Sequence, residues 1–235
     1  MNLISDRPPG WEVALERNRL YGAYPAQVTD IKDPDSQGRV KVKLPWSPDT
    51  GDGSYQVWAR LAVLMAGANR GTWFIPDPND EVLVMFEGGD PRRPYVVGML
   101  WNGQDTPPET MDGGGRNFKK TIRSRNGVKI TIDDTDGSES ITLQTPAGQT
   151  VTLKDGPGSI ELQDSNGNDV KLDTSGVTVT ASAKVSVQAS DVEINAPSVN
   201  VTTPLAVFSG VVQANCFLTP SVVSSSYTPG AGNIW

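Results

Sequence analysis

A repeat of short apolar pairs fills the second half of the chain and limits its fold more than any other feature. From residue 128 onward, Val, Ile or Leu recurs at positions i and i+2, with Gly, Asn, Asp, Ser and Pro between the pairs. Each unit is a short strand with one apolar face that it cannot bury alone, so the strands must stack. The pairs that we expect to form the core of the stack are Ile130 and Ile132, Ile141 and Leu143, Val151 and Leu153, Ile160 and Leu162, Val170 and Leu172, Val177 and Val179, Val185 and Val187, Val192 and Ile194, and Val199 and Val201.

Two ways of stacking these strands are open. One chain could coil on itself with three strands per turn, or three chains could wind around one axis, each supplying every third strand on each face of a prism. The second arrangement leaves no lateral sheet edge except at the two ends. We therefore predict a homotrimer whose residues 130–207 form an intertwined triple-stranded β-helix.

The region 21–101 differs in composition and is expected to form a separate small barrel. It holds Trp46, Trp58, Trp73 and Trp101. Its stretch 39–44 alternates charged residues with Val and Leu, which is typical of a half-buried strand. Several short strands in so few residues favour a closed barrel over an open sheet with exposed edges. The fold class is all-β, and the strands are expected at 27–31, 39–44, 57–63, 81–86 and 95–100.

Three further segments complete the expected organisation. Residues 1–20 form an N-terminal segment with a short helix at 11–20, and residues 208–235 form a tip region. Residues 102–129 are interpreted as a linker, whose part from Arg116 to Lys129 has six basic and no acidic residues. That stretch is either a docking collar for an acidic partner or the solvated first strand of the repeat.

The composition argues against most catalytic and metal chemistry. The chain has no histidine and one cysteine, Cys216, which excludes a Ser-His-Asp triad, a His-ligated metal and an internal disulfide. Glu87 and Asp90 lie in a proline-rich turn, and the acidic loop 133–139 lacks the ligand spacing of a calcium loop. We expect no catalytic residues, no cofactor and no metal, and hence no enzyme.

The charge and the hydropathy pattern limit partners and location. A net charge of −7 argues against nucleic acid, since phosphate binding requires a basic surface. The first ten residues lack the apolar run of a signal peptide, and nothing approaches the length of a membrane-spanning segment. We therefore expect the chain to be assembled in the cytoplasm.

Three stretches of the first half resemble a known family. They are G-R-V-K-V-K-L-P-W at 38–46, V-W-A-R at 57–60, and G-T-W-F-I-P-D-P-N-D-E-V-L-V-M-F-E-G-G-D-P-R-R-P-Y-V-V-G-M-L-W at 71–101. They look like the barrel of the phage baseplate assembly protein V family and of the related VgrG spikes. The resemblance implies an oligonucleotide/oligosaccharide-binding (OB) barrel followed by a trimeric triple-stranded β-helix. This barrel lacks the basic groove of a nucleic-acid-binding OB domain.

The resemblance also implies a function and partners. It implies the central spike of a contractile tail baseplate or injection particle, which punctures the target cell envelope when the sheath contracts. The short N-terminal segment implies that the baseplate hub is a separate protein. With no H-x-H motif for a tip iron, the tip is closed by its own apolar residues or by a PAAR-like protein. Tyr227, Ile234 and Trp235 are the candidate contacts for that tip protein. A trimeric receptor-binding fibre or adhesin is the alternative.

Overall fold

The computed structural model describes residues 19–45 and 55–225. The chain divides into two compact units, Met1–Lys184 and Val185–Trp235, which are considered separately. Strands form almost all of the regular structure that is described, with one short 3₁₀ turn, η1 (Glu87–Gly89), so the all-β class is confirmed. The helix expected at 11–20 lies outside the described residues. Within them, no helix has the length and hydropathy needed to span a membrane.

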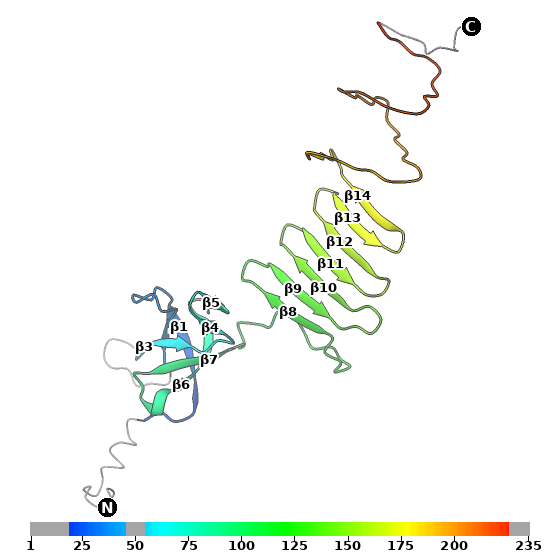
Figure 1. Ribbon diagram of the computed structural model, residues 1–235. Helices are drawn as coiled ribbons and strands as arrows, with labels where there is room; N and C mark the ends of the chain where they lie inside the picture. The colour runs from blue at the N-terminus through cyan, green and yellow to red at the C-terminus, as the bar shows by residue number, and fades with distance from the viewer. Residues whose placement is uncertain (1–18, 46–54, 226–235) are drawn as a thin grey trace, which may run out of the picture. The chain divides into compact units, whose positions relative to one another are not determined.

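Five strands close into a barrel in the first unit (Figure 1). The strand order is β1-β2-β3-β7-β6; β3 and β7 pair in parallel, and the other neighbours are antiparallel. A separate two-stranded hairpin of β4 (Ala66–Gly67) and β5 (Arg70–Gly71), not expected from the sequence, follows β3. The barrel strands are β1 (Ala23–Asp30), β2 (Val40–Lys43), β3 (Gln56–Leu61), β6 (Glu81–Phe86) and β7 (Pro94–Leu100).

The alternation of residues along the barrel strands produces its core. In β2, Val40 and Val42 are fully buried, while the intervening Lys41 and Lys43 remain half-buried on the outer surface. Successive side chains of a strand point to opposite faces, so each strand contributes every second residue to the interior. The buried core consists of Ala26, Val28, Val40, Val42, Leu44, Ala59, Val82, Val84, Phe86 and Val96.

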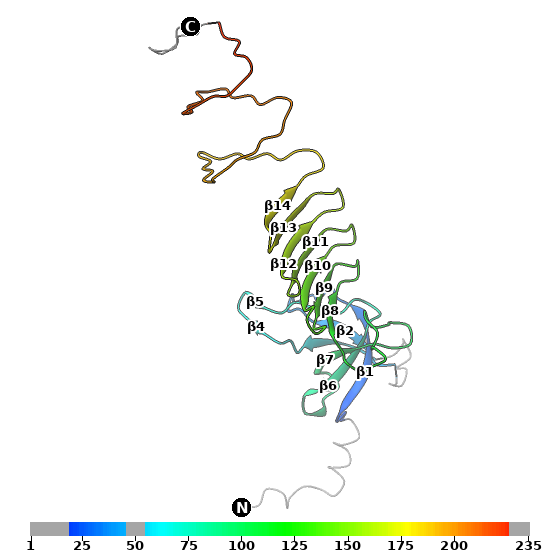
Figure 2. The same cartoon turned by 90° about the vertical axis from the view of Figure 1, so that its right-hand side faces the viewer.

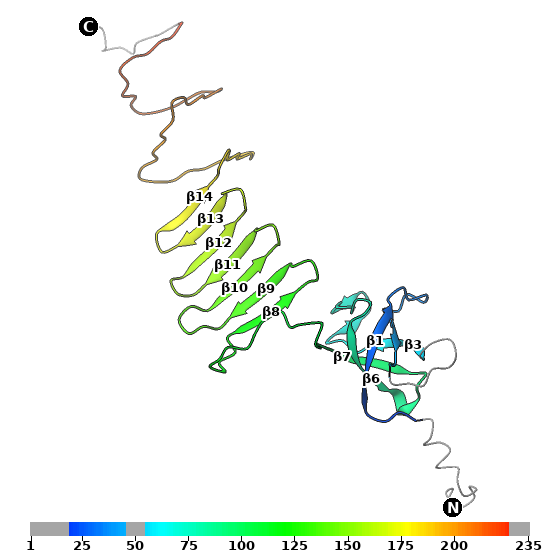
Figure 3. The same cartoon turned by 180° about the vertical axis from the view of Figure 1, so that it is seen from behind.

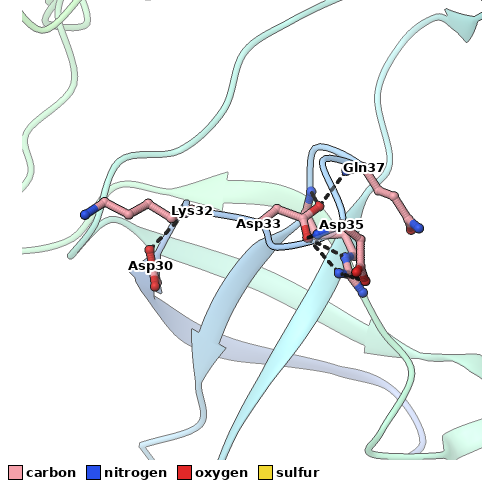
Figure 4. A network of polar contacts seen from close by, with 6 residues as sticks. Asp30, Lys32, Asp33, Asp35 and Gln37 are labelled. Atoms are coloured by element: carbon pink, nitrogen blue, oxygen red, sulfur yellow. Dashed lines mark hydrogen bonds and ion pairs between the residues drawn. The ribbon is translucent and has the colours of Figure 1, made fainter.

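The turn between β1 and β2 is organised by one carboxylate, that of Asp33 (Figure 4). It accepts hydrogen bonds from the backbone N–H groups of Asp35, Gln37 and Arg39, at 3.1, 2.7 and 3.1 Å. The guanidinium of Arg39 adds an ion pair at 2.6 Å. The hydrogen bond from Arg39 and the backbone N–H groups hold the pKa of Asp33 well below its usual range.

Seven consecutive strands form a second sheet in the same unit, in the order β14-β13-β12-β11-β10-β9-β8 (Figures 1 and 3). Every strand pairs antiparallel with its neighbours in sequence. Figure 2 shows these strands stacked one after another in chain order. This differs from the expected prism, in which one chain supplies only every third strand of a face. The strands are β8 (Lys119–Arg123), β9 (Lys129–Asp133), β10 (Ser140–Gln144), β11 (Thr150–Lys154), β12 (Ser159–Gln163), β13 (Asp169–Asp173) and β14 (Gly176–Thr180).

The second unit has a different character. Its described part, residues 185–225, contains no strand and follows an open, winding course in Figure 1. The apolar pairs continue here, so the sequence repeat extends beyond the last strand of the sheet.

The apolar pairs of the second unit are exposed in the single chain. Val187, Ile194 and Val201, which the sequence analysis placed in the core of the stack, are 73%, 70% and 72% exposed in the single chain. Their pair partners Val185, Val192 and Val199 are exposed as well. The physical reason is that no strand of the same chain, within the described residues, pairs with these segments or covers their apolar side chains.

Candidate functional site

The register of the seven-stranded sheet places the repeated apolar residues on one face, in two columns. Residues that are directly opposite across antiparallel strands share a face of the sheet. One column runs through Ile132, Ile141, Leu153, Ile160, Leu172 and Val177. The other runs through Ile122, Ile130, Leu143, Val151, Leu162, Val170 and Val179. We call these two columns the apolar face.

The apolar face is uncovered in the single chain. Ile141 is 43% exposed and Leu162 is 45% exposed, whereas the polar neighbours Thr142 and Thr152 on the opposite face are more buried than this. The apolar side chains are thus more exposed than the polar ones. A sheet with one solvated face normally buries its apolar side. Contiguous apolar surface of this kind marks a site of protein association.

The opposite face is polar and is suited to solvent. Thr131, Thr142 and Thr152 lie opposite one another on successive strands, and Glu161 and Lys171 continue the same column. The Lys171 ammonium lies 3.4 Å from the Glu161 carboxylate, and the hydrogen bond to Glu161 raises the pKa of Lys171. These exposed contacts complete a two-faced sheet whose apolar side needs a partner.

The structure gathers the first six expected pairs on the apolar face. The pairs from Ile130 and Ile132 to Val177 and Val179 all lie in its two columns. Ile122, which the sequence analysis did not include, begins one of the columns. An i, i+2 search does not find Ile122, because its neighbours at that spacing are Lys120 and Ser124; only its pairing with Ile130 across β8 and β9 places it in the column.

The last three expected pairs are not brought into the apolar face. Val185, Val187, Val192, Ile194, Val199 and Val201 belong to the second unit and are not part of the sheet. Ile194 and Val201 have no strand beside them within the described residues of their own chain. Their burial between chains stays a prediction. Tyr227, Ile234 and Trp235 lie outside the described residues.

The basic stretch 116–129 is largely neutralised within the chain. It contains strand β8 of the sheet, and four of its six cations form ion pairs: Arg116 with Asp112, Lys120 with Asp134, Arg125 with Asp77 and Lys129 with Glu109. Among the described residues, no carboxylate lies within ion-pairing distance of the other two, Lys119 and Arg123. The stretch therefore favours the first-strand interpretation over a docking collar.

A cationic and aromatic surface instead lies on the outside of the barrel, where the sequence analysis expected no basic groove. Lys41 lies opposite Trp58 across β2 and β3, and Arg60 lies opposite Tyr95 across β3 and β7. The Lys41 ammonium is 6.0 Å from the Trp58 ring centroid and the Arg60 guanidinium 5.6 Å from that of Tyr95, within cation–π range. With Lys43 these residues form what we call the cationic barrel face. The alternation in K-V-K at 41–43 and W-A-R at 58–60 indicates that Lys41, Trp58 and Arg60 point outward, but it does not show which strands are neighbours.

The carboxylates considered for catalysis or metal binding have structural partners. Glu87 accepts a hydrogen bond from the Tyr95 hydroxyl at 3.1 Å, and Asp90 pairs with Arg92 at 2.9 Å. The hydrogen bonds from Arg92 lower the pKa of Asp90 to about 2. Asp133 caps its own turn through Thr135. Within the described residues, no group of His, Cys, Asp and Glu is arranged to hold a metal ion.

Comparison with protein families identifies both regions. Residues 24–101 match the type VI secretion system/phage-baseplate injector OB domain, and residues 140–201 match the phage baseplate V C-terminal trimerisation domain. An injector-type OB domain followed by a trimerisation domain defines the class of the protein by its two domains. The chain is a baseplate V/VgrG-like protein.

Curated relatives agree with this assignment. The type VI secretion system spike proteins VgrG4b and VgrG1b of Pseudomonas aeruginosa are 34% and 29% identical over 56% and 51% of this chain. The actin cross-linking toxin VgrG1 of Vibrio cholerae is 30% identical over 46% of it. The matched segments cover only 18%, 17% and 10% of these three relatives, so most of each relative has no counterpart in the alignment.

Proposed function

We propose that the protein is the central spike of a contractile injection baseplate, assembled as a homotrimer. The observation that carries this proposal is the apolar face: two unbroken columns of Val, Ile and Leu that a single chain leaves open. Three copies related by a three-fold axis can turn these faces inward and bury them against one another. Each apolar side chain so buried contributes about 1.5–3 kcal/mol, and the match to a trimerisation domain supports three copies rather than two.

The proposed mechanism is mechanical. The needle crosses the envelope of the target cell when the sheath contracts, and the barrel transmits the force from the tail tube. The distal part of the chain suits this role because charges are sparse there: Lys184, Asp191 and Glu193 are the charged residues from Thr174 to Trp235. A shaft with few ionised side chains avoids the cost of carrying them into lipid, about 2.5–3.5 kcal/mol each.

The barrel is proposed to dock on a separate hub protein of the baseplate. The cationic barrel face supports this, because Lys41, Lys43 and Arg60 have no ion-pair partner among the described residues. Lys41 and Arg60 also lie beside Trp58 and Tyr95, respectively. Aromatic and basic side chains of this kind are enriched in protein interfaces. The complementary hub surface is therefore expected to be acidic.

The spike is proposed to act without enzymatic activity of its own. Incubation of the trimer with peptidoglycan and with polysaccharides is expected to give no turnover. Turnover that disappears on Glu87→Gln or Asp90→Asn would overturn this part of the proposal.

At the distal end, the segment from Tyr227 to Trp235 is proposed to seat a PAAR-like tip protein or to close the needle by itself. Deletion of residues 227–235 distinguishes binding of a tip protein from self-closure of the needle. If the trimer keeps its melting temperature but a tip protein no longer co-purifies with it, the segment is the binding site for that protein. A large fall in the melting temperature with no partner found indicates self-closure.

The spike function is tested in a strain that produces the particle. Deletion of the gene is expected to abolish sheathed particles in electron micrographs, and expression of the full chain is expected to restore them. Complete particles that contract but do not attach to target cells would instead support the receptor-binding fibre or adhesin.

A further inference from the structure

The seven-stranded sheet has two edges of different chemistry, because its turns alternate between the two sides of the ladder of strands (Figure 3). The turns of one edge contain four carboxylates and no basic residue, and we call this edge the acidic ridge. The turns of the other edge contain four side-chain amides, one arginine and one aspartate, and we call it the amide ridge. The acidic ridge consists of residues 134–139, 155–158 and 174–175, and the amide ridge of residues 124–128, 145–149 and 164–168.

The first two turns of each ridge lie directly against one another. Each of the six turns contains or adjoins a glycine, which permits such close approach. On the acidic ridge, the Asp155 N–H donates a hydrogen bond to the Glu139 carbonyl oxygen at 2.9 Å. On the amide ridge, a Cβ added to Gly127 would lie 3.4 Å from the Pro146 ring. Each ridge therefore presents a closed surface there rather than separate loops.

A trough of about 720 Å³ lies beside the acidic ridge. Its floor is the column of the apolar face that runs from Ile132 to Leu172. Of the described residues that line it, five are acidic and one, Lys154, is basic. Glu139 and Asp155 form no ion pair within the described part of the chain. An occupant of this trough must therefore supply apolar contact and hydrogen-bond donors, and must not add negative charge.

The amide ridge meets these requirements. The side-chain amide of Asn or Gln donates two hydrogen bonds, and bonds to a carboxylate are stronger than bonds between neutral groups. The charged members of the ridge are already engaged: Arg125 is ion-paired, and Asp164 accepts hydrogen bonds from backbone N–H groups of its own turn. Two acidic ridges, in contrast, would repel each other. The exposed amides are Asn126, Gln149 and Asn166.

We propose that the trough beside the acidic ridge of one subunit binds the amide ridge of a second copy of this chain. This deepens the proposed trimer and rests on it. A contact between two different surfaces of the same chain, repeated by rotation, closes into a ring. Each subunit then inserts its amide ridge beside one neighbour and receives the amide ridge of the other, while the apolar faces point toward the axis.

Disulfide trapping tests which ridges meet. In a Cys216→Ser parent, Glu139→Cys on the acidic ridge is combined with Gln149→Cys on the amide ridge. The five residues of β10 separate these positions within one chain, a span of roughly 17 Å that an intra-chain disulfide cannot bridge. A ladder of covalent dimer and trimer is expected on a non-reducing denaturing gel.

The controls use the same acidic position. Glu139→Cys/Asp155→Cys joins two adjacent turns of one chain and is expected to remain monomeric on the gel, as is Glu139→Cys alone. Dimers of that single variant would show that acidic ridges meet each other, which overturns the proposal. Asn126→Cys or Asn166→Cys replaces Gln149→Cys to allow for a shifted level. Inter-chain bonds in any of the three combinations support the proposal, and none in any of them overturns it while the trimer stands. A monomeric Cys216→Ser parent overturns the trimer itself.

Opposite charges at the same two positions test the complementarity. Asn126→Glu/Gln149→Glu is expected to melt several degrees below Asn126→Lys/Gln149→Lys at low salt, because its carboxylates face the acidic ridge. The difference should shrink at high salt. The same two exchanges at the exposed Gln37 and Gln104 are the control for net charge. A difference of equal size at both pairs of positions would contradict the contact between the two ridges.

Discussion

Leu172 and Val177 lie directly opposite each other across β13 and β14, although only the tight turn Asp173–Gly176 separates them in sequence. With this pair, the column that begins at Ile132 on β9 reaches the last strand of the sheet. No polar residue interrupts the column from β9 onward. The apolar face therefore behaves as one continuous surface, and its behaviour on substitution is the most direct test of what covers it.

The substitution Ile141→Asp is expected to abolish the trimer. Ile141 lies between Ile132 and Leu153, and three carboxylates near one axis would be buried without partners, at about 3–5 kcal/mol or more per chain. The control Thr142→Asp adds the same charge to the adjacent residue on the opposite face and should leave the trimer intact. Multi-angle light scattering at micromolar concentration measures both. Equal behaviour of the two variants would show that the apolar face is not the interface.

The same reasoning extends into the second unit. Val187→Asp is expected to prevent formation of the trimer, whereas Ser186→Asp, one residue away, should be tolerated. Because alternate residues of a strand point to opposite faces, the two variants test whether the apolar pairs beyond β14 also point inward. A stable Val187→Asp trimer would exclude them from the core.

Leu162→Ala provides a quantitative measure of burial. In the single chain Leu162 is 45% exposed, and truncation of a residue so exposed would cost about 1 kcal/mol or less. A leucine fully enclosed by neighbouring subunits costs about 2–5 kcal/mol when reduced to alanine. Chemical denaturation at fixed trimer concentration distinguishes the two values, and the smaller one would place Leu162 at the surface of the assembly.

Asp33→Asn is expected to lower the melting temperature of the barrel by a few degrees at pH 7 and by much less near pH 2. The pKa of Asp33 is depressed in the folded protein, first by the hydrogen bond from Arg39, so its carboxylate stabilises the fold above the unfolded pKa of about 3.9. That contribution is lost as the pH falls through the acid range. Fluorescence of Trp58, which lies beside Arg39, reports the transition. A difference between the two proteins that does not change with pH would contradict the assignment.

The double variant Lys43→Glu/Arg60→Glu is expected to weaken binding of the trimer to its baseplate hub at least tenfold without lowering the melting temperature. The effect should diminish at high salt, because exposed charges are screened. Lys32→Glu/Arg70→Glu introduces the same charge change at other exposed positions and is the matched control. Equal loss of binding in both variants would point to net charge rather than to the cationic barrel face.

Much of the fold follows from the sequence because alternation is a local property. Val40 and Val42 are buried and Lys41 is not, as the V-K-V-K pattern predicts. The twelve core candidates from Ile130 to Val179 share one face because their spacing is two.

Burial and pairing across chains are not local, and the predicted core beyond β14 stays a prediction. Ile194 and Val201 have the same spacing as Ile141 and Leu143, yet the single chain leaves them 70% and 72% exposed. Spacing tells which side chains share a face, whereas burial depends on what lies against that face.

Pairing between distant parts of one chain is equally hard to predict. The parallel contact of Arg60 with Tyr95 and the neutralisation of Lys129 by Glu109 depend on which strands meet. The cationic barrel face and the paired basic stretch were therefore not foreseen.

The glycine turns between β8 and β14 have a kinetic consequence. Each strand of this sheet bonds to the next strand in sequence, so its contacts close short loops and can form within one chain, on the microsecond scale of hairpins. The segment after Thr180 has no such local partner within the described residues and must wait for two other chains. We therefore expect refolding to have a fast phase that is independent of protein concentration and a slow phase that accelerates with it, with residues 185–207 protected from hydrogen exchange only in the second.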